Sequence, residues 1–276
     1  MKKLIPIICI TLLLLSCNSE NKTNQNAQPV SYKDKTIMAI FAHSDDERFV
    51  SPILAKYAKE GVNVYLVLAT DGSKGVTPHA NIPAGDSLAK VRAREALCTT
   101  KTLGINPPIL LNYSDGELAL WDNIFSLDDK IDSLFTTYQP NVVITWGADG
   151  GYGHPDHRMV GSIVTEVFQR EASEKMRQLL YVGFLKEALE TSPKLNTEKA
   201  NWFKENLKTT QKKFLTYRIP YEKEDLQLGR QAFGCCKSQY IPEVMDELFV
   251  LIAQHKGLVY FRPWNGSEVI KNDIFE

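Results

Sequence analysis

The amino-acid sequence predicts an α/β fold of three layers, in which helices cover both faces of a mainly parallel β-sheet. From residue 35 onward, short apolar runs alternate with segments of helical length, and this alternation is typical of right-handed βαβ units. The 276-residue chain is 43% hydrophobic and 24% charged, so it can bury a core without disulfides or a structural metal. Its 32 basic and 33 acidic residues show no charge excess that would indicate nucleic acid as a partner.

The N-terminal segment predicts export and lipid anchoring. Residues 1–16 have a basic start and an apolar run that is shorter than the ~20 residues of a membrane-spanning helix, as in a signal peptide. The run ends in Leu-Leu-Ser-Cys, which resembles a bacterial lipobox, so we expect Cys17 to be lipidated. A plain signal peptide and a buried N-terminal helix are the alternatives. We therefore expect a protein of the bacterial cell envelope, periplasmic or on the outer membrane, that contacts the membrane only through its lipid anchor.

The remaining chain divides into a tether and one domain. Residues 17–32 are polar, and they predict a disordered segment because they have too little apolar surface to offset the entropy of ordering. Residues 33–276 are expected to form a single domain. Beyond the anchor the cysteines are Cys98, Cys235 and Cys236. Their number is odd and two of them are neighbours, which rarely bridge each other, so the sequence shows no disulfide framework.

Within the domain, buried strands are predicted by short apolar runs and helices by apolar residues at three- and four-residue spacing. The expected strands are 36–41, 62–69, 108–111, 142–145 and 179–184, and the expected helices are 46–60, about 86–104, 127–138 and about 155–170. Beyond Leu185 the pattern weakens to a polar helical segment, 192–213, and an amphipathic helix, 239–253.

Two polar clusters directly follow predicted strands. The first strand runs into Ala-His-Ser-Asp-Asp-Glu (42–47), and the fourth is followed by His-Pro-Asp-His (154–157). In parallel sheets, ligands bind beyond the carboxyl ends of the strands, so we expect the clusters to meet there. Each cluster alone also fits a helix cap with a first-turn carboxylate.

Together the clusters supply the ligands of a catalytic zinc site, which uses about three His, Asp or Glu side chains and an open position for water. His43, either Asp45 or Asp46, and either His154 or His157 complete that set. Consecutive residues leave the backbone in different directions, so the second carboxylate is free to act as general base on the attacking water.

The histidine that does not bind the metal is expected to assist the reaction. His154 and His157 are three residues apart and share a helix face. One imidazole can bind metal while the other, protonated, stabilises an oxyanion and protonates the departing amine. Asp156 can hold that imidazole in orientation and favour its charged form.

Four segments resemble the PIG-L (LmbE-like) deacetylase family in sequence and order. They are 42–47, 69–72, 91–96 and 154–157, and the similarity covers roughly residues 35–170. The resemblance implies a Rossmann-like fold and zinc-dependent hydrolysis of N-acetyl groups, typically on N-acetylglucosamine-type sugars. Another divalent transition metal in place of zinc stays open. The expected partner is an N-acetylated sugar or glycoconjugate.

The resemblance also implies roles for particular residues. It assigns the metal ligands to His43, Asp46 and His157, the general base to Asp45, the oxyanion-stabilising or acid histidine to His154 with Asp156 as its partner, and substrate contacts to Arg92 and Asp115. For both substrate contacts, a surface salt bridge or a turn is the alternative.

The sequence departs from the family pattern at two places. Ser44 stands where the family usually has Pro, so we expect a looser ligand loop, because Ser lacks the fixed φ of Pro. Residues 48–52, Arg-Phe-Val-Ser-Pro, replace a glycine-rich stretch and add bulk near the first helix. Cys236 stands where the family often has His and is not expected to bind metal, and His79 is expected in solvent.

These observations predict a lipid-anchored, zinc-dependent N-deacetylase. A non-catalytic sugar-binding lipoprotein on the same fold is one alternative. A hydrolase of non-sugar N-acyl substrates is the other.

Overall fold

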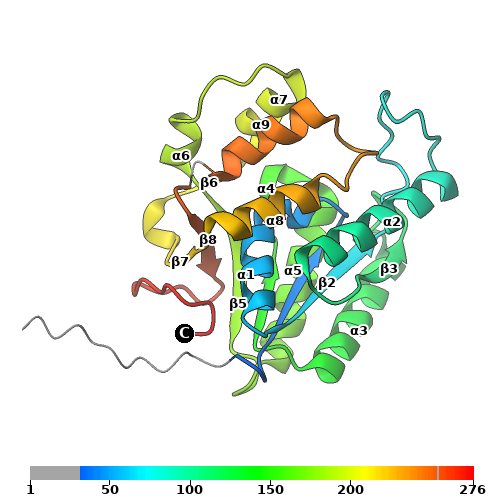
Figure 1. Ribbon diagram of the computed structural model, residues 1–276. Coiled ribbons are helices and arrows are strands. Elements are labelled where there is room, and N and C mark those ends of the chain that lie inside the picture. The colour runs from blue at the N-terminus through cyan, green and yellow to red at the C-terminus, as the bar shows by residue number, and fades with distance from the viewer. Residues whose placement is uncertain (1–31, 254) are drawn as a thin grey trace, which may run out of the picture. The chain divides into compact units, whose positions relative to one another are not determined.

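The eight strands of the computed structural model form one sheet that continues across the whole domain (Figure 1). The structure describes residues 32–253 and 255–276, so the predicted signal peptide, Cys17 and all but the last residue of the tether lie outside the described residues. The strands are β1 Thr36–Phe41, β2 Asn63–Thr70, β3 Ile109–Tyr113, β4 Val142–Thr145, β5 Gln178–Leu185, β6 Thr209–Thr210, β7 Tyr217–Pro220 and β8 Leu258–Pro263. Their order is β3-β2-β1-β4-β5-β8-β7, and the short β6 pairs with β5.

The first five strands are parallel, which confirms the predicted α/β class. Ala39 on β1, for example, pairs with Leu66 on β2 and with Ile144 on β4, and the β2–β3 pair has a register shift between Leu68 and Thr70. Every side chain of β1 is buried, as expected for a central strand that is covered on both faces. β7 and β8 extend the sheet in the antiparallel sense.

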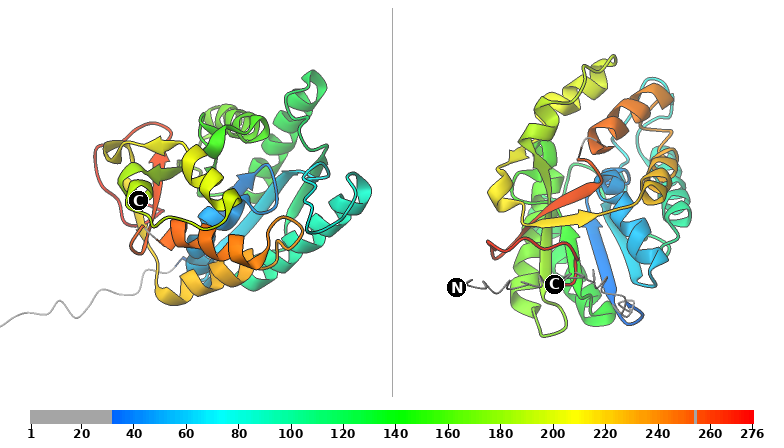
Figure 2. Two further views of the ribbon diagram at one scale, coloured as in Figure 1. Left: turned by 90° about the horizontal axis from the view of Figure 1, so that it is seen from above. Right: turned by 60° about the vertical axis from the view of Figure 1, so that its left-hand side comes forward.

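The helices form the outer layers. They are α1 Ser51–Lys59, α2 Asp86–Leu103, α3 Trp121–Tyr138, the single turn α4 Gly150–Gly153, α5 Pro155–Glu171, α6 Lys186–Glu190, α7 Glu198–Asn206, α8 Lys223–Phe233 and α9 Pro242–Ala253, with 3-10 turns at Asp46–Phe49 and Lys212–Phe214. α1, α2 and α8 pack together on one face of the sheet, and α3 packs with α5 on the other (Figure 2). Within the described part of the chain, no helix is both long and apolar enough to cross a membrane.

Several predicted boundaries differ from the structure for local reasons. The helix expected over 46–60 is a 3-10 turn followed by α1, because Pro52 is tolerated only in the first turn of a helix. The helix expected over 192–213 shrinks to α7. Thr197 caps its start by accepting the amide of Ala200. β7, β8 and α8 were not predicted.

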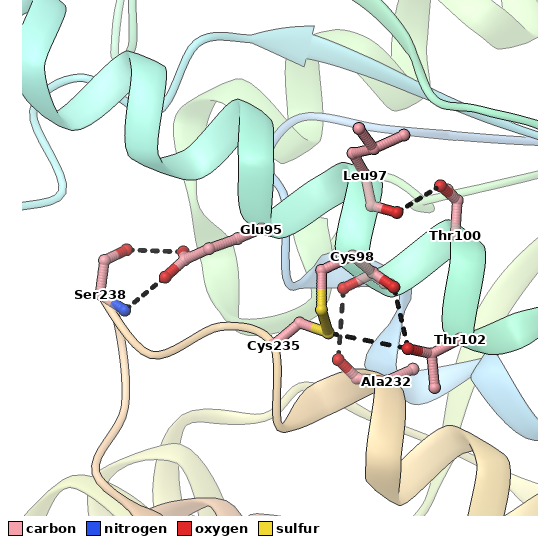
Figure 3. Close-up of a disulfide and its surroundings, with 9 residues drawn as sticks. Glu95, Leu97, Cys98, Thr100, Thr102, Ala232, Cys235 and Ser238 are labelled. Carbon is pink, nitrogen blue, oxygen red and sulfur yellow. Dashed lines mark hydrogen bonds between the residues drawn. A yellow bond between two sulfur atoms is a disulfide. The ribbon is translucent and has the colours of Figure 1, made fainter.

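A disulfide joins α2 to the segment after α8, although the sequence showed no such framework. Cys98 and Cys235 are bonded with their Cα atoms 5.9 Å apart (Figure 3). The two cysteines are 137 residues apart in sequence, and only the packing of α8 against α2 brings them together. Cys236 remains free and buried.

Candidate active site

The loop after β1 turns the side chains of Asp45 and Asp46 in different directions. Asp45 has a positive φ of 105°, a costly conformation for a residue with a side chain. The carboxylate of Asp46 faces His43 and His157, at 3.7 and 3.2 Å. That of Asp45 faces Arg92 instead, at 2.9 Å. The divergence of the two acids expected from the sequence is therefore present.

The loop after β4 presents the second cluster at the start of α5. His154 is the N-cap residue, with Pro155 at the first helical position. His157 lies in the first turn, where its ring stacks on Trp146 with 4.9 Å between centroids and 2° between planes. Gly151 has a φ of 71°, and a Cβ there would come within 2.8 Å of the Trp146 ring. The glycine therefore lets the loop close over this stack.

The three predicted metal ligands meet beyond the carboxyl ends of β1 and β4. His43 Nδ1 lies 3.1 Å from His157 Nε2, and Asp46 Oδ1 lies 3.2 Å from the same nitrogen. All three residues are nearly inaccessible, at 6%, 1% and 0% exposed for His43, Asp46 and His157. Zinc-to-nitrogen bonds of 2.0–2.1 Å in a tetrahedron separate ligand atoms by about 3.4 Å. The observed spacings fit that edge length.

Acceptors on the far side of each ring determine which nitrogen keeps the proton when the imidazole is neutral, the form that binds a metal. His157 Nδ1 is 3.0 Å from the carbonyl oxygen of Gly150, and His43 Nε2 is 3.0 Å from Asp115 Oδ1. Both partners are acceptors, so the imidazole protons lie on these outer nitrogens. In the neutral rings, two lone pairs and a carboxylate oxygen then face one another, an arrangement that a cation stabilises. The residues present therefore fit a metal ion.

The charge balance around the ligands also favours a bound cation. Five buried carboxyl groups gather here, on Asp45, Asp46, Glu47, Asp115 and Asp156. Burial, with Asp45 nearby, raises the pKa of Glu47 to about 7. The four others still outnumber the buried guanidinium groups of Arg48 and Arg92. Buried charge needs compensation, and a divalent cation supplies it.

His43 is the ligand most strongly influenced by these acids. Although burial opposes a charge on its ring, hydrogen bonds with Asp115, Asp156 and Asp46 raise the pKa of His43 well above its usual value. For Asp46, burial is likewise outweighed by His157 and His43, which hold the pKa of its carboxyl well below the usual range. The carboxylates therefore favour a positive charge on His43, and the histidines favour a negative charge on Asp46.

Asp45, the predicted base, is held by three side chains. Arg92 Nη2 donates to Oδ1 at 2.9 Å, while the hydroxyl of Tyr240 and Arg48 Nη1 donate to Oδ2 at 2.5 and 3.3 Å. A carboxylate has about four lone-pair directions, so one on Oδ1 stays free for a proton from water. Asp45 itself is 7% exposed.

Arg92 was expected at the substrate, but its surroundings favour a positioning role. It is 4% exposed. Besides Asp45, it donates to the hydroxyl and carbonyl oxygens of Ser44 and to the carbonyl oxygen of Gly72. Through these bonds Arg92 holds the ligand loop at Ser44, where the family usually has proline.

His154 contacts Asp156 through the backbone rather than through the expected carboxylate. Its Nδ1 accepts the amide of Asp156 at 3.2 Å. The Asp156 carboxylate instead accepts the amides of Gly116 and Leu118, at 2.7 and 3.3 Å, and lies 3.4 Å from His43 Nε2. Burial, with the two other histidines nearby, lowers the pKa of His154. These surroundings favour a neutral ring with its proton on Nε2, in place of the expected imidazolium.

Asp115, also expected to contact substrate, lies against His43 instead. Its second oxygen accepts the amide of Lys74 at 3.1 Å. Two further expectations concern residues outside the cluster. Cys236 is buried. Among the described residues, the groups spaced to hold a metal are His43 with His154 and His157, and His43 with Asp115 and Asp156. Neither group contains Cys236 or Asp46, so the case for Asp46 as a ligand rests on its 3.2 Å approach to His157. His79 Nε2 lies 2.9 Å from the Lys237 carbonyl oxygen in an exposed contact.

Sequence reasoning missed the residues that reach the site from outside the two motifs. Tyr240 is 195 positions from its partner Asp45, and no spacing signal links them. Arg48 appeared only as bulk. Its guanidinium lies 4.2 Å from the Phe49 ring and 5.2 Å from the Phe203 ring, while its Nε and Nη2 have no hydrogen-bond partner. The aromatic rings therefore provide the surroundings of this buried cation.

Comparison with known proteins gives these features a family context. Residues 38–168 match the family described as "PIG-L: GlcNAc-PI de-N-acetylase". A 1D-myo-inositol 2-acetamido-2-deoxy-alpha-D-glucopyranoside deacetylase from Mycobacteroides abscessus is 29% identical over 177 residues, 57% of this chain and 63% of that protein. A mycothiol S-conjugate amidase from Streptomyces coelicolor is 29% identical over 153 residues, 49% of this chain and 52% of that protein.

A solved structure resembles the whole fold. The N,N'-diacetylchitobiose deacetylase from Pyrococcus horikoshii aligns with a TM-score of 0.61 at 20% identity, covering 89% of this chain and 88% of that one. At this identity the likeness establishes the fold. The chain spans between half and two thirds of the length of the two sequence relatives.

Proposed function

Because the chain carries a domain of the PIG-L family over residues 38–168, we propose that it is a metal-dependent hydrolase that removes the N-acetyl group from an N-acetylglucosamine-type sugar or glycoconjugate. The observation that carries the proposal is the convergence of His43 Nδ1, His157 Nε2 and the Asp46 carboxylate within 3.1 to 3.7 Å. A carboxylate at the next position and an imidazole from the second loop are the groups an amide hydrolysis needs.

His43, Asp46 and His157 would hold a divalent metal, with zinc as the first candidate from the mixed nitrogen and oxygen donors. When bound, such an ion polarises an amide carbonyl and lowers the pKa of water. Trp146 contacts two of these proposed ligands. It stacks on His157, and its indole nitrogen donates to Asp46 Oδ2 at 3.3 Å. These contacts fix both ligands before any ion arrives.

The chain's own groups would carry the protons. Asp45 takes a proton from water as the water oxygen attacks the acetamide carbon. His154, protonated on Nε2, donates a hydrogen bond to the oxygen that gains negative charge. As the carbon–nitrogen bond breaks, Asp45 returns the proton to the amine; acetic acid and amine are formed, and the acid passes its proton to the amine, so that acetate and an ammonium group leave. Arg92, Arg48 and Tyr240 hold Asp45 at its position throughout.

Acetate release from purified, metal-loaded protein tests this proposal. The panel contains N-acetylglucosamine, its β1,4-linked oligomers and an N-acetyl amino acid. Wild type should release acetate from the sugars, and Asp45→Ala should keep the metal yet lose about 10²–10⁴-fold in kcat. Asp128→Ala is the matched control, because Asp128 pairs with Arg170 at the surface. Full activity in Asp45→Ala would overturn the assignment of the base.

The same panel separates the two alternatives. Acetate from the amino acid alone would favour a hydrolase of non-sugar N-acyl substrates. Sugar binding without acetate release, in protein shown to carry metal, would favour a non-catalytic sugar-binding protein.

We also propose that the protein works in the cell envelope, anchored through a lipid on Cys17. The lipobox-like Leu-Leu-Ser-Cys sequence supports the anchor. The Cys98–Cys235 disulfide supports an oxidising compartment. Metabolic labelling with a radioactive fatty acid tests the anchor: wild type should take up label, Cys17→Ala should not, and equal labelling of both would refute it.

A further inference from the structure

α7 lies at the active-site end of the sheet but outside the residues that match the family. It packs beside α4 and against α9, at the top of Figure 1. The helix is firmly held. Both oxygens of Glu247 on α9 accept amides at its start, from Asn196 at 2.6 Å and from Thr197 at 2.9 Å. At the other end of the same stretch, Lys204 donates to the carbonyl oxygen of Ser192 at 2.9 Å. These hydrogen bonds therefore hold α7 in a defined position beside the site.

Two aromatic contacts lead from the reacting centre to an open indole on α7. The rings of His154 and Tyr152 are 6.0 Å apart, and those of Tyr152 and Trp202 are 5.6 Å apart. Trp202 is 47% exposed, whereas its neighbour Phe203 is buried. Trp202 thus lies one ring beyond Tyr152, so two ring contacts connect His154 to an indole that is open to solvent.

Lys199 lies one turn earlier on the same face of α7 and approaches Tyr240, the residue that donates to the proposed base. Its ammonium donates to the carbonyl oxygen of Gln239 at 2.7 Å and lies 4.3 Å from the ring of Tyr240. The hydroxyl of that tyrosine in turn donates to Asp45. An ammonium has three donors, and one of them is occupied here. α7 therefore faces both the base and the histidine that stabilises the oxyanion.

We propose that α7 is the sugar-binding wall of the site. Trp202 stacks on the pyranose ring that carries the acetamide or on the next ring, and Lys199 donates to a ring hydroxyl. A pyranose offers an apolar face of C–H groups and a rim of hydroxyls, which match an exposed indole and a free ammonium. An acyclic N-acetyl amine lacks that face. The proposal rests on the deacetylase function proposed above and names the residues that select a cyclic substrate.

Kinetics of Trp202 variants test the selection. Trp202→Ala should raise KM for N-acetylglucosamine oligomers about 10-fold, with a smaller change in kcat, because Trp202 touches the sugar and not the reacting atoms. Trp202→Phe should recover most of this loss, and kcat/KM for the acyclic N-acetylethanolamine should stay unchanged. Lys199→Met should raise KM for the sugars alone. The matched control is Trp264→Phe, a 36% exposed tryptophan that contacts Leu179 at the start of β5, the end of the parallel strands opposite the site.

Tryptophan fluorescence gives a readout that does not need turnover. N-acetylglucosamine oligomers should change the emission of wild type and Trp264→Phe, and the change should be clearly smaller in Trp202→Phe, in which Trp146 beside His157 is still present. Unchanged sugar KM in Trp202→Ala, or an undiminished signal in Trp202→Phe, would overturn the sugar-binding wall while leaving the deacetylase intact. A Trp202-dependent signal without acetate release would instead keep the wall and reject the proposed chemistry.

Discussion

Replacing Asp115 with Asn should weaken metal binding, although Asp115 is not itself one of the three proposed ligands. Its carboxylate lies 3.0 Å from His43 Nε2 and is 7% exposed. Burial works against its charge, but the hydrogen bond with His43 and the nearby Arg92 outweigh it and lower the pKa of Asp115 to about 2. At neutral pH the carboxylate can only accept, so it keeps the proton on Nε2 and the lone pair of His43 on Nδ1, toward the metal.

An amide at position 115 removes the charge and can present its own N–H group to the ring. Loss of such an outer partner typically lowers metal affinity about 10- to 100-fold, which corresponds to about 1.4–2.7 kcal/mol. Competition against a chromogenic zinc chelator measures this directly, with Asp128→Asn as the surface control. Unchanged metal affinity together with a raised sugar KM would refute this reasoning, and would show that Asp115 contacts substrate, as the family resemblance implies.

Three further predictions concern the base, the disulfide and a half-buried histidine. Tyr240→Phe removes one donor from Asp45 and should lower kcat about 10-fold at unchanged metal content, so unchanged kcat would count against this contact. Reduction of Cys98–Cys235, which closes a 137-residue separation, should cost about 4 kcal/mol and lower Tm by roughly 10 °C, as calorimetry with and without reductant can show; an equal Tm would contradict the estimate. Burial lowers the pKa of His255 to about 4, so its neutral form is favoured in the folded state and stability is lost as the pH falls from about 6.5 toward 4. Wild type should lose about 3 kcal/mol more than His255→Phe over that window in urea titrations, and parallel curves would exclude this role.

The parallel half of the fold was predictable because its signals are local. β1 to β5 are continuous apolar runs, and the helices between them have regular apolar spacing. The antiparallel β7 and β8 were missed for the opposite reason. β7 has four residues, and its partner β8 begins 41 positions after its start, so pairing rather than pattern defines both strands.

In the site too, some residues could be predicted from local signals, and others depend on long-range packing. The two polar clusters could be placed together because each lies beyond the carboxyl end of a parallel strand, and strand ends of one sheet share an edge. The choice of Asp46 and His157 within the clusters came from the family resemblance. Tyr240 and the cysteine pair depend on how α8 packs on α2, which no short-range signal records. For Arg92 the sequence indicated the neighbourhood, but the structure was needed to show that it holds Asp45.

The central claim is that one divalent ion is shared by two loops that lie more than a hundred residues apart. Elemental analysis of metal per chain, in wild type and in His157→Ala purified side by side, tests it most directly. The account predicts close to one equivalent in wild type and almost none in a variant that is still folded by circular dichroism. One equivalent in both proteins would contradict it.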